Sequence, residues 1–226
     1  MCTVTFIPQG EKGFILTSNR DESPKRAAKE MATKKIEGGV EVHFPKDAKA
    51  GGTWIAASND HRLVCVLNGA FKKHKHEPPY RLSRGIMALE FFEYDSAIDF
   101  FENFEFEGME PFTFIVVDRG NLFDFRWDGI KSYLHPLDNQ GAYIWSSSTL
   151  YPPEMQEKRK TVFLEWMEEQ SDISKEIILD LHLNGKVGDP ENDFVMNRQD
   201  LVRTVSITSV SYQDGAFAME FRDLVG

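Results

Sequence analysis

Cysteine is scarce in this sequence, with only Cys2 and Cys65 among 226 residues. Two cysteines cannot supply the framework of a disulfide-rich secreted domain. No apolar run approaches the roughly 18 residues that a membrane-spanning helix needs, and the N-terminus lacks the basic start and long apolar stretch of a secretory signal. These absences predict a soluble cytoplasmic protein with reduced thiols and no membrane span.

Positive charge is also in deficit, because the chain carries a formal net charge of −10. Residues 1–90 nevertheless hold 15 basic and 10 acidic residues, whereas residues 91–226 hold 11 and 26. The overall acidity argues against nucleic acid as the main partner. The basic first portion favours a small-molecule substrate or ligand that is anionic. A solvated surface with no binding role remains the alternative.

Two spacings of apolar residues divide the chain into strands and helices. Short apolar segments between Gly, Asn and Asp turns predict strands joined mainly by hairpins; they cover 3–8, 13–19, 52–58, 62–68, 112–118, 121–127, 130–136, 142–148 and a final hairpin over 203–221. Apolar residues at helical spacing predict four helices. The first begins near Leu82, the second follows a cap at Asp95, and the other two cover roughly 154–169 and 173–183. About ten strands are too many for one small open sheet. We predict an α+β fold: a four-layer αββα sandwich of two mostly antiparallel sheets, in one domain over 1–226.

The apolar pattern dissolves over residues 23–51, which are basic and punctuated by Pro and Gly. This segment is long for a connection inside a compact domain. Loops of that length are usually functional or mobile, so we predict a mobile loop here.

Cys2 directly follows the initiator Met. Removal of Met1 would leave the Cys2 thiol beside a free α-amino group with a pKa of roughly 7.7–8.0. Because that amine is a usable base near neutral pH, one residue would supply a complete nucleophile pair. The alternative is a small apolar residue that opens a buried strand.

Two further groups of polar residues follow predicted strands, where functional sites are common. Asn19, Arg20 and Asp21 come directly after an apolar run, and the hairpin would bring them near the N-terminus. Asn68 closes another strand, and its amide is a suitable oxyanion donor. The alternatives are an ordinary ion pair at a turn and a simple Asn-Gly turn.

Five ordered segments together resemble the NRDE family, which is named for its Asn-Arg-Asp-Glu motif and includes the transport and Golgi organisation protein 2 proteins. They are MCTVTF at the start, SNRDE at 18–22, GGTWIAAS at 51–58, VCVLNG at 64–69 and LSRG at 82–85. The resemblance is ordered along the first 85 residues and weakens from about residue 90.

The resemblance implies a fold similar to N-terminal nucleophile hydrolases, a group that includes penicillin acylases and bile-salt hydrolases. It implies that Cys2 is the nucleophile, that Asp21 orients its amine and that Asn68 contributes to the oxyanion hole. We also predict that the substrate is bound by Asn19, Arg20, Arg84, Ser147 and Arg203. Arg20 is chosen because arginine binds carboxylates and carbonyls, and Arg84 because it belongs to a basic cluster beside Asn68, whereas Ser147 and Arg203 are placed by the resemblance. Ser147 stands where many relatives have an Asn, and Ser18 where bile-salt hydrolases have an Arg.

Two functions follow from these expectations. The first is a cysteine amidohydrolase that cleaves a linear, non-peptide C–N bond through a thioester. The alternative is a noncatalytic protein on the same fold that binds or carries haem or an acylated ligand. His74-x-His76 together with His61 could suggest a metal site, but a His-x-His pair in a lysine-rich loop is usually solvated, so no metal is expected. No phosphate loop or covalent haem motif occurs, so no cofactor is expected either.

Overall fold

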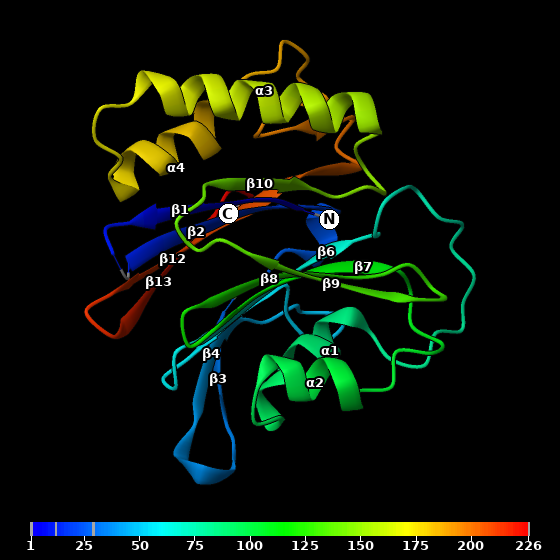
Figure 1. Ribbon diagram of the computed structural model, residues 1–226. Coiled ribbons are helices and arrows are strands. Elements are labelled where there is room, and N and C mark those ends of the chain that lie inside the picture. The colour runs from blue at the N-terminus through cyan, green and yellow to red at the C-terminus, as the bar shows by residue number, and fades with distance from the viewer. Residues whose placement is uncertain (1, 12, 29, 226) are drawn as a thin grey trace.

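A computed structural model describes residues 2–11, 13–28 and 30–225 of the chain. Two β-sheets are stacked face to face, and pairs of helices cover their outer faces (Figure 1). The helices are α1 (Arg84–Glu90), α2 (Ala97–Asn103), α3 (Pro153–Glu169) and α4 (Lys175–Asn184). The four-layer αββα sandwich predicted from the sequence is confirmed.

The first sheet has the strand order β10-β1-β2-β12-β11, with β13 also paired to β12, and every pairing is antiparallel. Its strands are β1 (Cys2–Gln9), β2 (Gly13–Glu22), β10 (Tyr143–Ser146), β11 (Asn197–Arg198), β12 (Val202–Gln213) and β13 (Ala216–Asp223). Side chains alternate across a strand. Cys2, Val4 and Phe6 therefore join the core between the sheets, whereas Ile7 packs into a second core beneath α3 and α4.

The second sheet runs β3-β4-β5-β6-β7-β8-β9, again antiparallel throughout. Its strands are β3 (Met31–Lys35), β4 (Glu41–Pro45), β5 (Ile55–Ser58), β6 (Arg62–Asn68), β7 (Phe112–Asp118), β8 (Asn121–Trp127) and β9 (Ser132–Leu137). All seven residues of β7 are buried, as expected for a strand covered on both faces.

The prediction of a long loop over residues 23–51 is wrong in its central part. Strands β3 and β4 form a hairpin there, and β4 pairs with β5 through Val42 and Ser58. The residues of β3 alternate between exposed and half-buried, so this edge strand has little apolar sequence to reveal it.

Serine side chains begin three of the four helices. Ser83, Ser96 and Ser174 each accept a hydrogen bond from the backbone N–H three residues later. This contact satisfies an N–H that the first helical turn leaves free. The predicted cap at Asp95 is therefore displaced by one residue, to Ser96. No helix within the described residues is long and apolar enough to cross a membrane.

Candidate functional site

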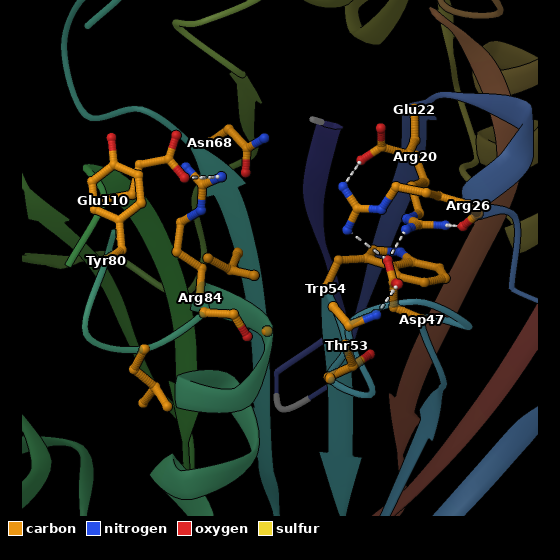
Figure 2. Close-up of a pocket in the computed structure, with 16 residues that line it drawn as sticks. Arg20, Glu22, Arg26, Asp47, Thr53, Trp54, Asn68, Tyr80, Arg84 and Glu110 are labelled. Carbon is orange, nitrogen blue, oxygen red and sulfur yellow. Dashed lines mark hydrogen bonds and ion pairs between the residues drawn. The ribbon is translucent and has the colours of Figure 1, made fainter. Parts of the chain in front are cut away.

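A cavity of about 330 Å³ opens at one end of the two sheets. It lies between the end of β2, the connection from β4 to β5, the end of β6 and the start of α1 (Figure 2). Its lining residues are Arg20, Glu22, Arg26, Asp47, Ala50, Gly52, Thr53, Trp54, Val66, Asn68, Tyr80, Leu82, Ser83, Arg84, Gly85 and Glu110. The cavity therefore collects three of the predicted site residues: Arg20, Asn68 and Arg84.

Arg20 is held tightly at one wall of the cavity. Its guanidinium lies 4.2 Å from the centre of the Trp54 ring and forms a buried ion pair with Asp47. It also donates to the backbone carbonyl of Arg26. Burial lowers the pKa of Arg20, and Asp47 acts against that shift. Arg20 is thus a fixed, largely compensated charge on a stacked aromatic surface.

Arg26 extends the same network toward solvent. Its guanidinium pairs with Glu22 at 2.8 Å and with Asp47 at 2.9 Å. Burial acts to raise the pKa of Asp47, but the backbone N–H of Ala50 and the two arginines lower it below its ordinary value. Asp47 is therefore an anion at neutral pH, and it joins Arg20 and Arg26 through one carboxylate oxygen.

The opposite wall holds a second paired charge (Figure 2). Arg84 lies 2.9 Å from Glu110 and donates to the carbonyl of Pro111. His74 and His76 contact the other oxygen of Glu110 at 3.1 and 3.2 Å. Burial acts to raise the pKa of Glu110, but Arg84 and the two histidines lower it overall. Each arginine of the cavity thus has a carboxylate partner, and Figure 2 places Asn68 between the two charged groups.

Cys2 is the first residue of β1 and pairs with Arg20 of β2. Its side chain is fully buried in the core between the sheets, and it is not among the lining residues of the cavity. Its carbonyl accepts a hydrogen bond of 3.0 Å from the backbone N–H of Ser147. Met1, on whose removal a free Cys2 amine depends, lies outside the described residues.

Asp21 is fully buried and accepts hydrogen bonds at both carboxylate oxygens. Thr204 donates to one at 2.7 Å, and Tyr151 donates to the other at 2.8 Å. Burial raises the pKa of Asp21, while the positive charge of Arg159 acts in the opposite direction. The register of β1 on β2 places the amino end of Cys2 toward Asp21, because Cys2 pairs with Arg20 and Thr3 with Asn19.

A tight turn fixes Asn68 at the end of β6. Gly69 has a φ of +80°, and its carbonyl accepts from the hydroxyl of Thr113 at 2.9 Å. The carbonyl of Asn68 accepts from the hydroxyl of Ser147 at 2.8 Å. A Cβ on Gly69 would lie 2.3 Å from the Ser148 hydroxyl. A side chain at this position would therefore have to displace the side chains of Ser148 and Thr149 and adopt a left-handed backbone.

Gly69→Ala is expected to destabilise the protein by at least about 3 kcal/mol, because it adds this overlap to the left-handed backbone cost. Gly120→Ala is the matched control, since Gly120 has a φ of +91° and nothing within 4 Å of its Cβ position. The control should lose only about 1–2 kcal/mol. Urea unfolding of both variants measures the difference; equal losses would show that the turn tolerates a side chain.

Asn19, which was predicted to bind the substrate, is not brought to the cavity by the structure. Its Nδ2 donates to the carbonyls of His182 and Phe194 at 2.8 and 2.7 Å. Its Oδ1 lies 2.6 Å from Nδ1 of His182, whose Nε2 lies 2.8 Å from the Thr5 hydroxyl. Since Oδ1 can only accept, Nδ1 of His182 carries the proton. Asn19 therefore fastens α4 to the outer face of the first sheet.

The burial of a neutral His182 against Asn19 predicts that the stability of the fold decreases in acid. Burial lowers the pKa of His182 to about 3, whereas an unfolded histidine binds a proton below about pH 6.5. As the pH falls from about 6.5 toward 3, His182 becomes protonated in the unfolded chain but stays neutral in the folded protein. The free energy of unfolding should then fall by up to about 1.4 kcal/mol per pH unit.

Urea unfolding between pH 6.5 and 5 tests this slope before ordinary carboxylates titrate. His182→Gln should flatten it, whereas substitution of the exposed His135 by Gln should leave it unchanged. An unaltered slope in His182→Gln would contradict the assignment.

The structure also leaves Ser147 and Arg203 outside the cavity lining. The Ser147 hydroxyl donates to Asn68 and lies 3.0 Å from the Thr149 hydroxyl, so it ties β10 to the end of β6. Arg203 lies opposite Glu22 in β12, and its guanidinium reaches Asp200 and the Leu224 carbonyl. The arginine close to Asp21 is instead Arg159 of α3.

Sequence reasoning missed most charged partners of the cavity. Asp47 lies in the segment expected to be a loop, and Glu110 precedes β7 without any motif. Trp54 belongs to the recognised GGTWIAAS segment, but its role as a surface for Arg20 has no signature in sequence. No sequence signal singled out Asp47, because the same basic segment also contains Glu30, Glu37 and Glu41.

The fold is shared with known hydrolases. An N-acylethanolamine-hydrolyzing acid amidase orthologue from Caenorhabditis elegans superposes with a TM-score of 0.62 at 13% identity, covering 92% of each chain. A single-residue variant of conjugated bile acid hydrolase from Clostridium perfringens superposes with a TM-score of 0.51 at 9% identity, covering 99% of this chain and 92% of that chain. At these identities the likeness shows the fold alone, which confirms the prediction of an N-terminal-nucleophile-hydrolase-like architecture.

Comparison with curated proteins finds no match. The profile of a protein family, Transport and Golgi organisation 2, matches residues 1–211. This span includes the whole cavity and both sheets except the end of β12 and β13. The resemblance seen in the first 85 residues thus extends along nearly the entire chain, and the protein belongs to the Transport and Golgi organisation 2 family.

Proposed function

We propose that this protein is an amidohydrolase that uses Cys2 as an N-terminal nucleophile after removal of Met1. The observation that carries the proposal is the position of Cys2. It begins a central strand of an N-terminal-nucleophile-hydrolase-like sandwich, directly opposite Arg20 at the cavity wall. Asp21 is buried beyond that pair, toward the amino end of Cys2.

The proposed reaction has two stages. The Cys2 thiol gives its proton to the freed α-amine and attacks the amide carbonyl, forming a C–S bond. The Asn68 amide and a backbone N–H hold the oxyanion. The C–N bond then breaks, and the leaving amine takes the proton from the Cys2 ammonium group. Water next attacks the thioester, releases the acid and restores the thiol.

The cavity favours a compact, polar substrate. Its volume of about 330 Å³ is at the small end of the range for ligand pockets. Its charges are paired, with three arginines against Glu22, Asp47 and Glu110. A small amide that offers hydrogen-bond acceptors, and at most one anionic group, suits this lining better than a long apolar chain does.

The test is a screen of small N-acyl amides that measures amine release. Protein with a free Cys2 is compared with protein that carries one additional residue before Cys2. The proposal expects turnover only with the free N-terminus, because an amide nitrogen is no base. Equal turnover by both proteins would overturn the role of the amine.

A second candidate is a noncatalytic binding protein for haem or an acylated ligand. The complete burial of the Cys2 side chain, outside the cavity lining, favours it. Stoichiometric binding without turnover, and without dependence on a free N-terminus, would support this candidate. A haem titration without a change in the Soret band would remove its haem version.

A further inference from the structure

Arg159 is a fully buried cation that no part of the proposed reaction uses. Its guanidinium donates to the hydroxyls of Thr3 and Ser146 and to the carbonyls of Asn192 and Asp193. All these acceptors are neutral, and no carboxylate of the described chain forms an ion pair with it. A buried charge without a direct counter-ion is costly unless a nearby charge offsets it.

Tyr151 links this cation to Asp21. The Arg159 guanidinium carbon lies 4.3 Å from the centre of the Tyr151 ring and 4.7 Å from the centre of the Phe194 ring. The Tyr151 hydroxyl donates to Asp21 at 2.8 Å. Burial and the charge of Asp21 raise the pKa of Tyr151, so its hydroxyl remains a donor. Tyr151 thus contacts the Asp21 carboxyl group through its hydroxyl and the buried Arg159 guanidinium through its ring.

The same strand pair connects Arg159 to the N-terminus. Thr3, which accepts from Arg159, directly follows Cys2 in β1. The amino end of Cys2 points along the register toward Asp21. A free α-amino group at this place would meet the charges of both Asp21 and Arg159.

We propose that Arg159 is a positioning residue that offsets the charge of Asp21 and so keeps the freed α-amino group of Cys2 neutral and basic. The inference rests on the proposed function for its purpose, although the charge balance can be measured without any turnover. With Asp21 alone, the amine would be held as an ammonium ion and could not accept the thiol proton.

The surrounding titratable groups do not replace Arg159. His182 of α4 remains neutral because burial lowers its pKa to about 3. Burial also raises the pKa of Cys65 in β6, which keeps it a thiol. Arg20 of β2 is paired with Asp47 on the inner face of the sheet. Arg198 of β11 contacts the Tyr151 ring at 5.6 Å, farther than Arg159.

The experiment measures the protonation of this amine directly. Because the chain has only two cysteines, protein labelled with ¹³C,¹⁵N-cysteine gives signals from Cys2 and Cys65 alone. Full-length protein lacking Met1, verified by intact mass, is titrated by NMR. The α-amine of the unmodified protein should half-titrate at or below the ordinary range of roughly 7.7–8.0.

Three variants separate charge from shape. Arg159→Gln should raise the midpoint by about one pH unit or more, and Arg159→Lys should keep it near the unmodified value. Asp21→Asn should lower it, which provides a second test if Arg159→Gln does not fold. Equal midpoints for the Gln and Lys variants, or no decrease in Asp21→Asn, would overturn the inference.

The titration is independent of the hydrolase proposal. A midpoint that follows the charge at residue 159, in protein that hydrolyses no amide, would refute the hydrolase and retain this role of Arg159. Amide turnover together with a midpoint that does not change with the charge at residue 159 would support the hydrolase and refute this role of Arg159.

Discussion

Cys2→Ala should reduce amide turnover by about 10⁴-fold or more, because it removes the atom that forms the thioester. The fold should survive, since the inner-sheet position of Cys2 loses only one sulfur atom among many apolar neighbours. Amine release measures the first effect, and thermal unfolding measures the second.

Cys65→Ala is the matched control for this substitution. Cys65 is also a fully buried thiol of the core between the sheets, but it lies within β6 and has no free amine. The control should retain turnover while it loses a similar amount of stability. Retained activity in Cys2→Ala would contradict the proposed mechanism outright.

Asn19→Leu should lower the free energy of unfolding by at least about 3 kcal/mol. The substitution preserves the approximate volume but leaves Nδ1 of His182 and two backbone carbonyls without their buried partner. Each unpaired buried group costs about 1–3 kcal/mol. Urea unfolding at neutral pH measures the loss.

Ser18→Ala provides the comparison one residue away. The Ser18 hydroxyl is buried and forms no hydrogen bond of ordinary geometry among the residues that the structure describes, although it lies close enough to the Cys65 thiol to act against the rise in that thiol's pKa. Because no ordinary hydrogen bond is lost with this hydroxyl, the substitution should change the free energy of unfolding by about 1 kcal/mol or less. A loss from Asn19→Leu as small as that would mean that the contacts with α4 do not stabilise the fold.

The layers of the fold followed from sequence because hairpin turns and apolar runs are local signals. Segments 112–118 and 121–127 are mostly apolar and bounded by turn residues, and they match β7 and β8. The edge strand β3 was not predicted, since its sequence MATKK has only two apolar residues and ends in two lysines, as a solvated loop would.

The site was less predictable, because side chains on one strand point to opposite faces. Asn19, Arg20 and Asp21 are adjacent in sequence, yet Arg20 lies at the cavity while Asn19 and Asp21 face the α3–α4 side. Residues that the sequence analysis treated as one cluster therefore belong to two separate sites on opposite faces of the sheet. The partners that decide its charges, Asp47 and Arg159, are far away along the chain.

The most direct test of the account is the intact mass of the protein after incubation with a small acylating probe. We predict loss of Met1 and the addition of a single acyl group, mapped to Cys2 and absent from Cys2→Ala. Retained Met1, or an acyl group on Cys65 or a lysine with Cys2 unmodified, would contradict the N-terminal nucleophile and leave the binding protein as the better description.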